Sequence, residues 1–226
     1  MWEFIKETEA AELIFYGLMI ALFLAEIILR YVLKVAKNNI VLEYVDSGFI
    51  AILIALVLRL FLIQAFKIPS SSMENTLLIG DHLLVNKFIY GTNLPFTDKQ
   101  ILKFKDPERG DIIIFKYPRN PRKSFIKRCV GVPGDKIEIR DKVVYINDKV
   151  QQEEYIVHKD FKVLSAYQAP RDNFGPIIVP EKHYFMMGDN RDFSSDSRFW
   201  GTLDRKFIRG KAWVIYFPIT RWRKIE

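Results

Sequence analysis

Two long apolar stretches near the N-terminus are the first pattern in the hydrophobic and polar positions of this chain. Residues 13–33 are interrupted only by Glu26 and Arg30, and residues 49–66 carry a single charge, Arg59. Helices of these lengths would reach about 31 and 27 Å, close to the roughly 30 Å of a hydrocarbon core. Neither stretch has a polar face wide enough for water. The pattern predicts two transmembrane helices, with a buried hairpin of a soluble protein as the alternative.

Short β-branched and alternating runs replace these stretches after residue 73. We expect strands at 111–117, 125–132, 136–146, 183–187 and 211–217. The third is predicted to be a hairpin that turns near residues 140–142. Residues 147–176 are more charged and lack periodicity, so they are predicted to be an excursion from the main sheet. The predicted fold is two N-terminal transmembrane helices followed by a mostly antiparallel all-β domain.

The charges around the two stretches predict a topology. Lys34 and Lys37 lie in the short connection 34–48, and short loops rich in Lys and Arg stay in the cytoplasm. Residues 1–12 and the domain 67–226 would then lie outside it. The acidic N-terminal flank and the lack of a small-residue cleavage site are not typical of a cleaved targeting peptide.

Composition restricts the remaining function classes. The chain has 226 residues, a net charge of +7 and one cysteine, Cys129, which excludes an intrachain disulfide. Residues 1–66 hold five basic and seven acidic side chains, which leaves a net charge of +9 on the rest. Such a domain would be attracted to anionic lipid headgroups. Its basic residues are scattered, so no nucleic-acid partner is predicted.

Three consecutive serines, Ser70 to Ser72, follow Pro69 where the second apolar stretch ends. Proline fixes its own φ and favours an extended residue before it, so the approach to these serines is stiff. A rigid hydroxyl-rich corner suits a nucleophile whose substrate also lies in the bilayer. A polar linker between an anchor and a soluble domain explains the pattern equally well.

A lysine can activate a serine if its amine is neutral, which requires burial because free lysine titrates near about 10.4. Lys127 lies in a strand-like apolar run, residues 125–130, but the pattern alone favours a solvated strand lysine. There is no Gly-x-Ser-x-Gly elbow, phosphate loop or dinucleotide fingerprint. The three histidines have no metal-ligand spacing. We therefore predict no metal and no cofactor.

Four blocks in a fixed order resemble the type I signal peptidases, the membrane-anchored serine proteases that remove export signals. They are residues 68–81 (IPSSSMENTLLIGD), 109–115 (RGDIIIF), 126–135 (IKRCVGVPGD) and 188–201 (GDNRDFSSDSRFWG). The resemblance covers nearly the whole chain. It implies a signal-peptidase-like β fold.

The resemblance also implies roles for individual residues. Ser72, directly before Met73, would be the nucleophile and neutral Lys127 the general base. The Ser70 hydroxyl and the Ser72 N–H would form the oxyanion hole, and Ser194 would hydrogen-bond and orient the lysine amine. Four residues would support the site: Asp189, Arg191 and the ion pair of Asp196 with Arg198. The residues implied for the substrate pocket are Phe66, Ile68, Pro69, Met73, Leu77, Leu83, Ile126 and Val130.

By the same resemblance, the substrates are exported preproteins, cut after small residues in an Ala-x-Ala-like pattern. The enzyme would be a multi-pass protein of the cell (inner) membrane, with membrane lipids and the export machinery as partners and its catalytic domain outside the cytoplasm. The chain departs from the family pattern at Asn75, where many members have Pro, and at Ser71, where many have Gly. Two alternatives are a non-catalytic, membrane-tethered β domain that binds peptides or lipids, and a Ser/Lys self-cleaving regulator.

Overall fold

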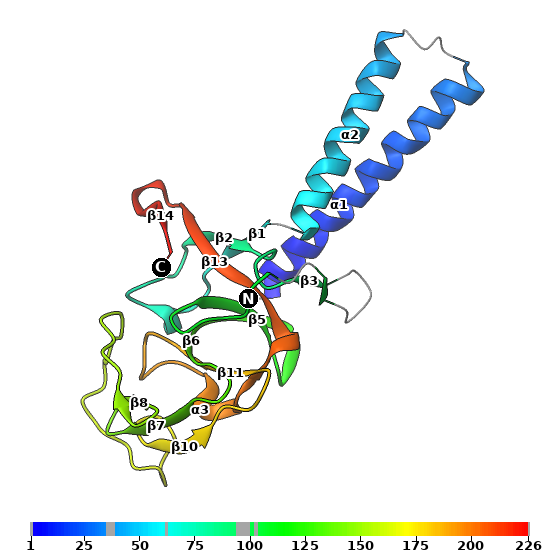
Figure 1. Ribbon diagram of the computed structural model, residues 1–226. Helices are drawn as coiled ribbons and strands as arrows, with labels where there is room; N and C mark the ends of the chain where they lie inside the picture. The colour runs from blue at the N-terminus through cyan, green and yellow to red at the C-terminus, as the bar shows by residue number, and fades with distance from the viewer. Residues whose placement is uncertain (1, 35–38, 62, 94–99, 102–103, 226) are drawn as a thin grey trace. The chain divides into compact units, whose positions relative to one another are not determined.

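The computed structural model describes residues 2–34, 39–61, 63–93, 100–101 and 104–225. The chain divides into two compact units, residues 1–62 and residues 63–226. The first is helical and the second is built of β-strands (Figure 1).

The helical unit is a hairpin of two long helices, α1 (Trp2–Ile27) and α2 (Ile40–Phe61), with a π-helical turn at Ile28–Val32. Arg30, which interrupts the first apolar stretch, forms ion pairs with Glu26 on its own helix (3.0 Å) and with Asp46 on α2 (2.6 Å). Among the described residues, no helix combines the length and the apolar character that crossing a membrane requires.

The second apolar stretch, residues 49–66, is not a single helix. Helix α2 begins nine residues before it, at Ile40, and ends at Phe61. Strand β1 (Ile63–Lys67) follows, and it pairs antiparallel with β2 (His82–Asn86). Pairing with β2 satisfies the backbone hydrogen-bonding groups on one side of residues 63–67. The number of hydrophobic residues in the stretch cannot indicate a pairing with a strand so distant in sequence.

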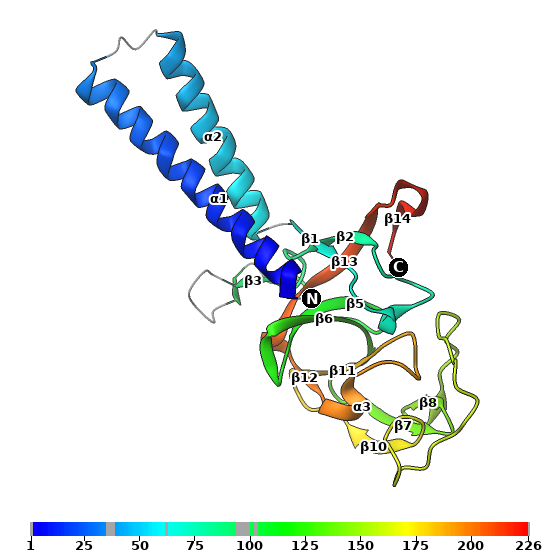
Figure 2. The same cartoon turned by 180° about the vertical axis from the view of Figure 1, so that it is seen from behind.

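Among the described residues, the main sheet of the β unit has eight strands, and all their pairings are antiparallel. Its order is β1, β2, β13 (Ile208–Phe217), β5 (Ile112–Tyr117), β6 (Asn120–Gly131), β11 (His183–Met187) and β12 (Leu203–Asp204). The C-terminal strand β14 (Arg223–Lys224) pairs with β13. Figures 1 and 2 show this curved sheet from opposite sides. The strands expected at 111–117, 125–132, 183–187 and 211–217 are confirmed.

A second sheet has the order β10 (Phe174–Ile178), β7 (Lys136–Arg140), β8 (Val143–Ile146) and β9 (Lys149–Val150). Strands β7 and β8 are the hairpin expected at 136–146. Its turn residues Asp141 and Lys142 have φ of 46° and 72°, the left-handed conformation typical of tight hairpins. A short pair, β3 (Thr92–Asn93) and β4 (Gln100–Ile101), completes the strands described. The short helical segments are α3 (Ser197–Trp200) and 3-10 turns at Ser71–Met73, Arg205–Phe207 and Ile219–Arg221.

Residues 151–173, between β9 and β10, contain no strand, only an isolated bridge from Val157 to Asn190. Their anchor is the Asp192 carboxylate, which accepts the backbone N–H groups of Lys159 (2.7 Å) and Asp160 (2.8 Å). It also pairs with Lys142 at 2.5 Å. Burial would raise the pKa of Asp192, but these donors lower it to about 2. Residues 151–173 are therefore held against the β unit by hydrogen bonds to the block 188–201.

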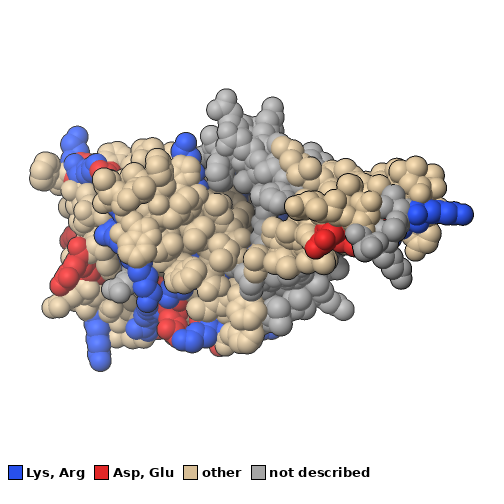
Figure 3. All heavy atoms as spheres, turned by 90° about the horizontal axis from the view of Figure 1, so that it is seen from above, with Lys and Arg blue, Asp and Glu red and all other residues tan. Residues whose placement is uncertain are grey.

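The surface charges agree with the scattered basic residues of the sequence. On the face in Figure 3, Lys and Arg side chains stand apart, several of them beside acidic ones. Among the described residues, one apolar core cluster lies around Phe115 and Tyr184 and another around Ile137 and Phe185.

Candidate active site

Ser72 lies in a tight turn inside a loop that closes on itself. We call residues 68–81 the serine loop. Its ends are joined by hydrogen bonds from Ile68 N to Asp81 O (2.8 Å) and from Gly80 N to Ile68 O (2.9 Å). Ser70 is extended, and the 3-10 turn Ser71–Met73 follows it. Met73 is fully buried and so anchors the turn, while Ser72 is 7% exposed.

Lys127 reaches this serine from strand β6. Its Nζ lies 2.6 Å from Ser72 Oγ, within hydrogen-bonding distance, and donates to Ile126 O at 2.9 Å. The lysine is only 4% exposed. Burial lowers the pKa of Lys127 from 10.5 to about 8, while the carboxylates of Asp196 and Asp189 act weakly in the opposite direction. The structure thus brings together the two residues that the sequence singled out.

This pairing has the elements of a serine nucleophile and its base. An amine with a pKa near 8 is neutral in a substantial fraction of molecules at pH 7–8, and its lone pair can take the hydroxyl proton. A serine hydroxyl without such a base is a weak nucleophile.

Of the two further serines expected here, Ser70 is exposed and Ser194 is buried. The expected hydrogen bond between Ser194 and the lysine amine is not formed among the described residues. The two hydrogen bonds of that amine go to Ser72 Oγ and Ile126 O.

Gly188 lets the block 188–201 approach Ser72 closely. A Cβ added at Gly188 would overlap the carbonyl oxygen of Ser72 and the side chain of Ser194. The next residues continue this contact, because Asn190 N donates to Ser72 O at 3.2 Å and Asn190 Nδ2 to Ser71 O at 3.3 Å. Neither Gly188 nor Asn190 was predicted to have a role, although both lie in the block 188–201.

Asp196 and Arg198 form a fully buried ion pair rather than a surface bridge. Arg198 donates to both carboxylate oxygens at 2.9 and 2.8 Å. It also donates to the carbonyls of Arg171 and Arg191, both at 2.7 Å. Burial would raise the pKa of Asp196, but the Arg198 guanidinium holds it below its usual value. The pair ties the block 188–201 to the segment that precedes β10.

Asp189 pairs with Arg128, the residue after Lys127 on β6. The guanidinium donates to both carboxylate oxygens at 2.9 and 2.8 Å, and the Thr76 hydroxyl donates to Asp189 at 2.5 Å. This buried group connects the base strand, the serine loop and the block 188–201. Arg191 supports the same block as expected, because its Nε donates to Gly188 O at 3.1 Å. It also binds Glu153 through two bonds of 2.7 Å. Arg128 was not among the predicted site residues, and its position directly after Lys127 is the feature of the sequence that could have indicated it.

Most residues expected to line the substrate pocket are buried near the serine loop or on the strands beside it. Phe66 and Leu83 face each other across β1 and β2. Pro69 is exposed, and Val130 lies with Ile137 and Phe185 in a separate core cluster. The buried members of the set are Phe66, Ile68, Met73, Leu77, Leu83, Ile126 and Val130.

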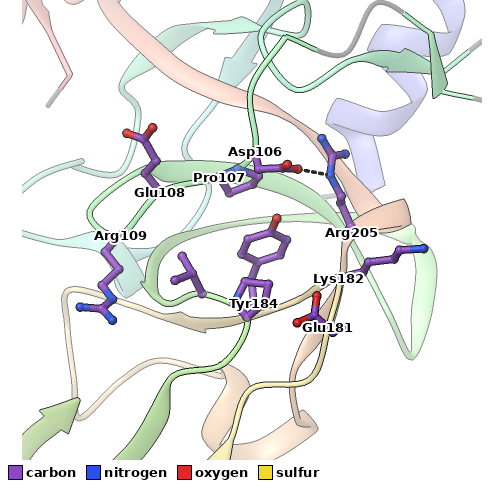
Figure 4. A pocket seen from close by; sticks show the side chains of 10 residues that line it. Asp106, Pro107, Glu108, Arg109, Glu181, Lys182, Tyr184 and Arg205 are labelled. Carbon is purple, nitrogen blue, oxygen red and sulfur yellow. Dashed lines mark hydrogen bonds and ion pairs between the residues drawn. The ribbon is translucent and has the colours of Figure 1, made fainter. Parts of the chain in front are cut away.

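A cavity of about 450 Å³ lies elsewhere in the β unit, around Tyr184 and Pro107 (Figure 4). Arg205 and Asp106 form an ion pair of 2.6 Å at its side. None of the residues expected at the active site lines it. Within the part of the chain that is described, no cluster of His, Cys, Asp or Glu is arranged to hold a metal ion.

An antiparallel β unit with a buried contact between Ser72 and Lys127 is the arrangement expected of a serine peptidase. The family described as "Signal peptidase, peptidase S26" matches residues 41–217. The chain therefore belongs to the S26 family of signal peptidases, as the four sequence blocks predicted.

Three relatives illustrate the similarity. "Signal peptidase I" of Pseudomonas fluorescens is 40% identical over an alignment covering 81% of this chain and 75% of the relative. "Signal peptidase I" of Aquifex aeolicus is 36% identical, covering 75% and 81%. "Signal peptidase I" of Bacillus licheniformis is 34% identical, covering 84% and 96%. The enzyme is a serine peptidase that removes signal peptides from preproteins.

Proposed function

We propose that Ser72 is the nucleophile and Lys127 the general base of this peptidase. The 2.6 Å separation of Nζ and Oγ inside a buried site is the observation that carries the proposal. Ser72 Oγ bonds to the scissile carbonyl carbon while its proton passes to the neutral amine. The amine then gives this proton to the leaving nitrogen as the C–N bond breaks. Water then attacks the acyl carbon while the same amine takes a proton from it, and this proton passes to Ser72 Oγ as the ester bond breaks.

The negative charge on the substrate carbonyl oxygen would be stabilised by the Ser70 hydroxyl and the Ser72 N–H. Ser70 is extended, exposed and only two residues before the nucleophile, which supports this role. Loss of one such donor typically costs about 2.7–4 kcal/mol of transition-state stabilisation.

The signal peptide would bind as an extended strand beside β1 and be cut after small residues. Strand β1 supports this, because it lies at the end of the main sheet with β2 as its neighbour and runs directly into the serine loop. An open edge offers main-chain hydrogen bonds to an extended peptide. The buried apolar side chains around the loop would leave shallow pockets that exclude large residues.

The two helices would anchor the enzyme in the cell (inner) membrane, with the β unit outside the cytoplasm. Exposed large apolar side chains on both helices support the anchor: Ile14, Leu18, Ile20, Phe23 and Leu24 on α1, and Ile50, Leu53, Ile54 and Leu58 on α2. The mutual ion pairs of Glu26, Arg30 and Asp46 reduce the cost of placing charges in lipid. Anchoring raises the effective concentration of membrane-bound substrate. Lipids and the export machinery would be its partners there.

Cleavage of an exported precursor by the full-length protein in detergent tests these assignments. Ser72→Ala and Lys127→Ala should each abolish cleavage, whereas the controls Ser71→Ala and Ser124→Ala should retain most of it. Replacing the small residue before the cut by Phe should block cleavage by the unaltered enzyme. Full activity of Lys127→Ala would rule out the proposed base.

A further inference from the structure

The ends of the serine loop meet at Asp81, a buried carboxylate that the catalytic chemistry does not use. Asp81 is 1% exposed. Its backbone carbonyl accepts Ile68 N at 2.8 Å, and its carboxylate accepts Leu78 N at 2.8 Å. Ile68 is two residues before Ser70 and four before Ser72. The position of Asp81 therefore controls where the loop that carries both serines begins.

Two arginines from the C-terminal end of the chain hold this loop from outside. Arg221 donates to both carboxylate oxygens of Asp81, through Nε at 2.8 Å and Nη2 at 2.9 Å. Arg223 donates from Nη2 to Thr76 O at 2.5 Å. Both arginines lie in the C-terminal segment drawn in red in Figure 1, which comprises the 3-10 turn after β13 and strand β14.

We propose that Arg221 and Arg223 are positioning residues for catalysis, acting through the serine loop. A planar guanidinium bound to a carboxylate through two parallel hydrogen bonds fixes orientation as well as distance. Arg221 fixes the end of the loop, and Arg223 fixes its middle, four residues after Ser72. The inference rests on the proposed role of Ser72.

The hydrogen bonds described for Arg221 and Arg223 go to the serine loop and not to the strand of Lys127, which meets this loop at Ser72 and, through Arg128 and Asp189, at Thr76. Lys127 lies on β6 between β5 and β11, and its partner Ile126 O belongs to the same strand. Loss of Arg221 would thus shift Ser70 and Ser72 relative to an unmoved amine. A misplacement of about 1 Å can cost roughly 100-fold in rate. The rate of the chemical step should fall, while the pKa of Lys127 should stay where it is.

The test compares Arg221→Ala, Arg223→Ala and the control Arg119→Ala in the full-length enzyme, with a signal-peptide substrate. Like Arg223, Arg119 is an exposed arginine that donates to a backbone carbonyl, that of Phe199 at 3.0 Å, outside the serine loop. We expect Arg221→Ala to lower kcat by about 10-fold or more, with a smaller change in KM and an unchanged midpoint of the pH–kcat profile. Arg223→Ala should lower kcat less, and Arg119→Ala should match the unaltered enzyme. The double variant Arg221→Ala, Asp81→Asn should lose no more kcat than either single variant, because both substitutions break the same ion pair between Arg221 and Asp81.

A kcat of Arg221→Ala equal to that of Arg119→Ala would overturn the inference, as would a shifted pH midpoint. If Arg221→Ala does not fold, Arg221→Lys carries the test. It keeps the charge but loses the paired hydrogen bonds, so its kcat should lie below that of the unaltered enzyme, and an unchanged kcat would overturn the inference. Ser72→Ala distinguishes failure of the proposed nucleophile from failure of the positioning role. Activity in Ser72→Ala would refute the nucleophile. An inactive Ser72→Ala together with a fully active Arg221→Ala would refute only the positioning role.

Discussion

Lys127 Nζ meets Ser72 Oγ at 2.6 Å although 55 residues separate them in sequence. The contact joins a 3-10 turn to the middle of a long strand, in a site that excludes most solvent. Burial that lowers the pKa of the amine must also destabilise the fold whenever that amine is charged.

Replacing Lys127 by Met should abolish activity but stabilise the protein at pH 7. The fall in pKa from 10.5 to about 8 corresponds to roughly 3 kcal/mol against the charged amine in the folded state. Methionine removes that cost but leaves Ile126 O without its donor, so we expect a gain of about 1–2 kcal/mol.

The pH dependence of this gain has a definite sign. Between pH 8 and 10.5 the unfolded chain binds the Lys127 proton and the folded protein does not, so the unaltered enzyme gains stability as pH rises. The advantage of Lys127→Met should therefore shrink toward pH 10.5. Denaturant unfolding at pH 7 and pH 10 measures it, and an equal difference at both would contradict the buried neutral lysine.

Gly188→Ala should lose most activity. The new methyl would overlap the Ser72 carbonyl and the Ser194 side chain, so the serine loop or the block 188–201 must shift. A shift of about 1 Å can cost roughly 100-fold in kcat. Gly17→Ala is the matched control, because nothing lies within 4 Å of its added Cβ. Processing rates of the two variants measure the effect, and near-normal processing by Gly188→Ala would show that the close approach is unnecessary.

Asn75→Pro should destabilise this enzyme even though many family members have proline at the matching position. Asn75 has φ of 83°, whereas the proline ring fixes φ near −65°. We expect a cost of more than about 1 kcal/mol in the free energy of unfolding. Asn75→Gly is the control, because glycine adopts positive φ readily. Thermal unfolding compares them, and equal stability of Asn75→Pro would mean that the turn rearranges freely.

Breaking the pair of Asp196 with Arg198 should be costly. Arg198→Ala leaves a fully buried carboxylate without its cation, which typically costs about 3–5 kcal/mol. Lys206→Ala breaks the exposed pair with Asp204 and should cost at most about 1 kcal/mol. Denaturant unfolding measures the loss in the free energy of unfolding for both variants. Similarly small losses would contradict a large contribution of the buried pair to stability.

The sequence predicted those elements whose signal is local. The hairpin at 136–146 follows from alternation and turn residues, and it is present as β7 and β8. Strand β6 begins at Asn120, five residues before the expected start, because residues 120–124 are polar and join the strand only by pairing with β5. The strand at 63–67 was not predicted because it, too, depends on pairing with another strand, β2, and its residues continue the apolar run of the preceding helix.

The candidate site also has features that the sequence predicts and features that depend on tertiary packing. Lys127 could not be told from a surface lysine by its neighbours, and only the motif order selected it. The burial of the Lys127 side chain depends on the whole fold, and no local sequence pattern indicates it. The partner of Asp189 turned out to be Arg128, 61 residues away, and that of Arg191 turned out to be Glu153. Such pairings depend on how distant loops pack.

The pH dependence of Ser72 modification by a serine-directed covalent reagent tests the central claim most directly. Labelling should require an unprotonated Lys127, so its rate should rise with pH and reach half its maximum near pH 8. Lys127→Met should show almost no labelling at any pH. A midpoint above about pH 10, the range of an ordinary lysine, or equal labelling of Lys127→Met would contradict the account.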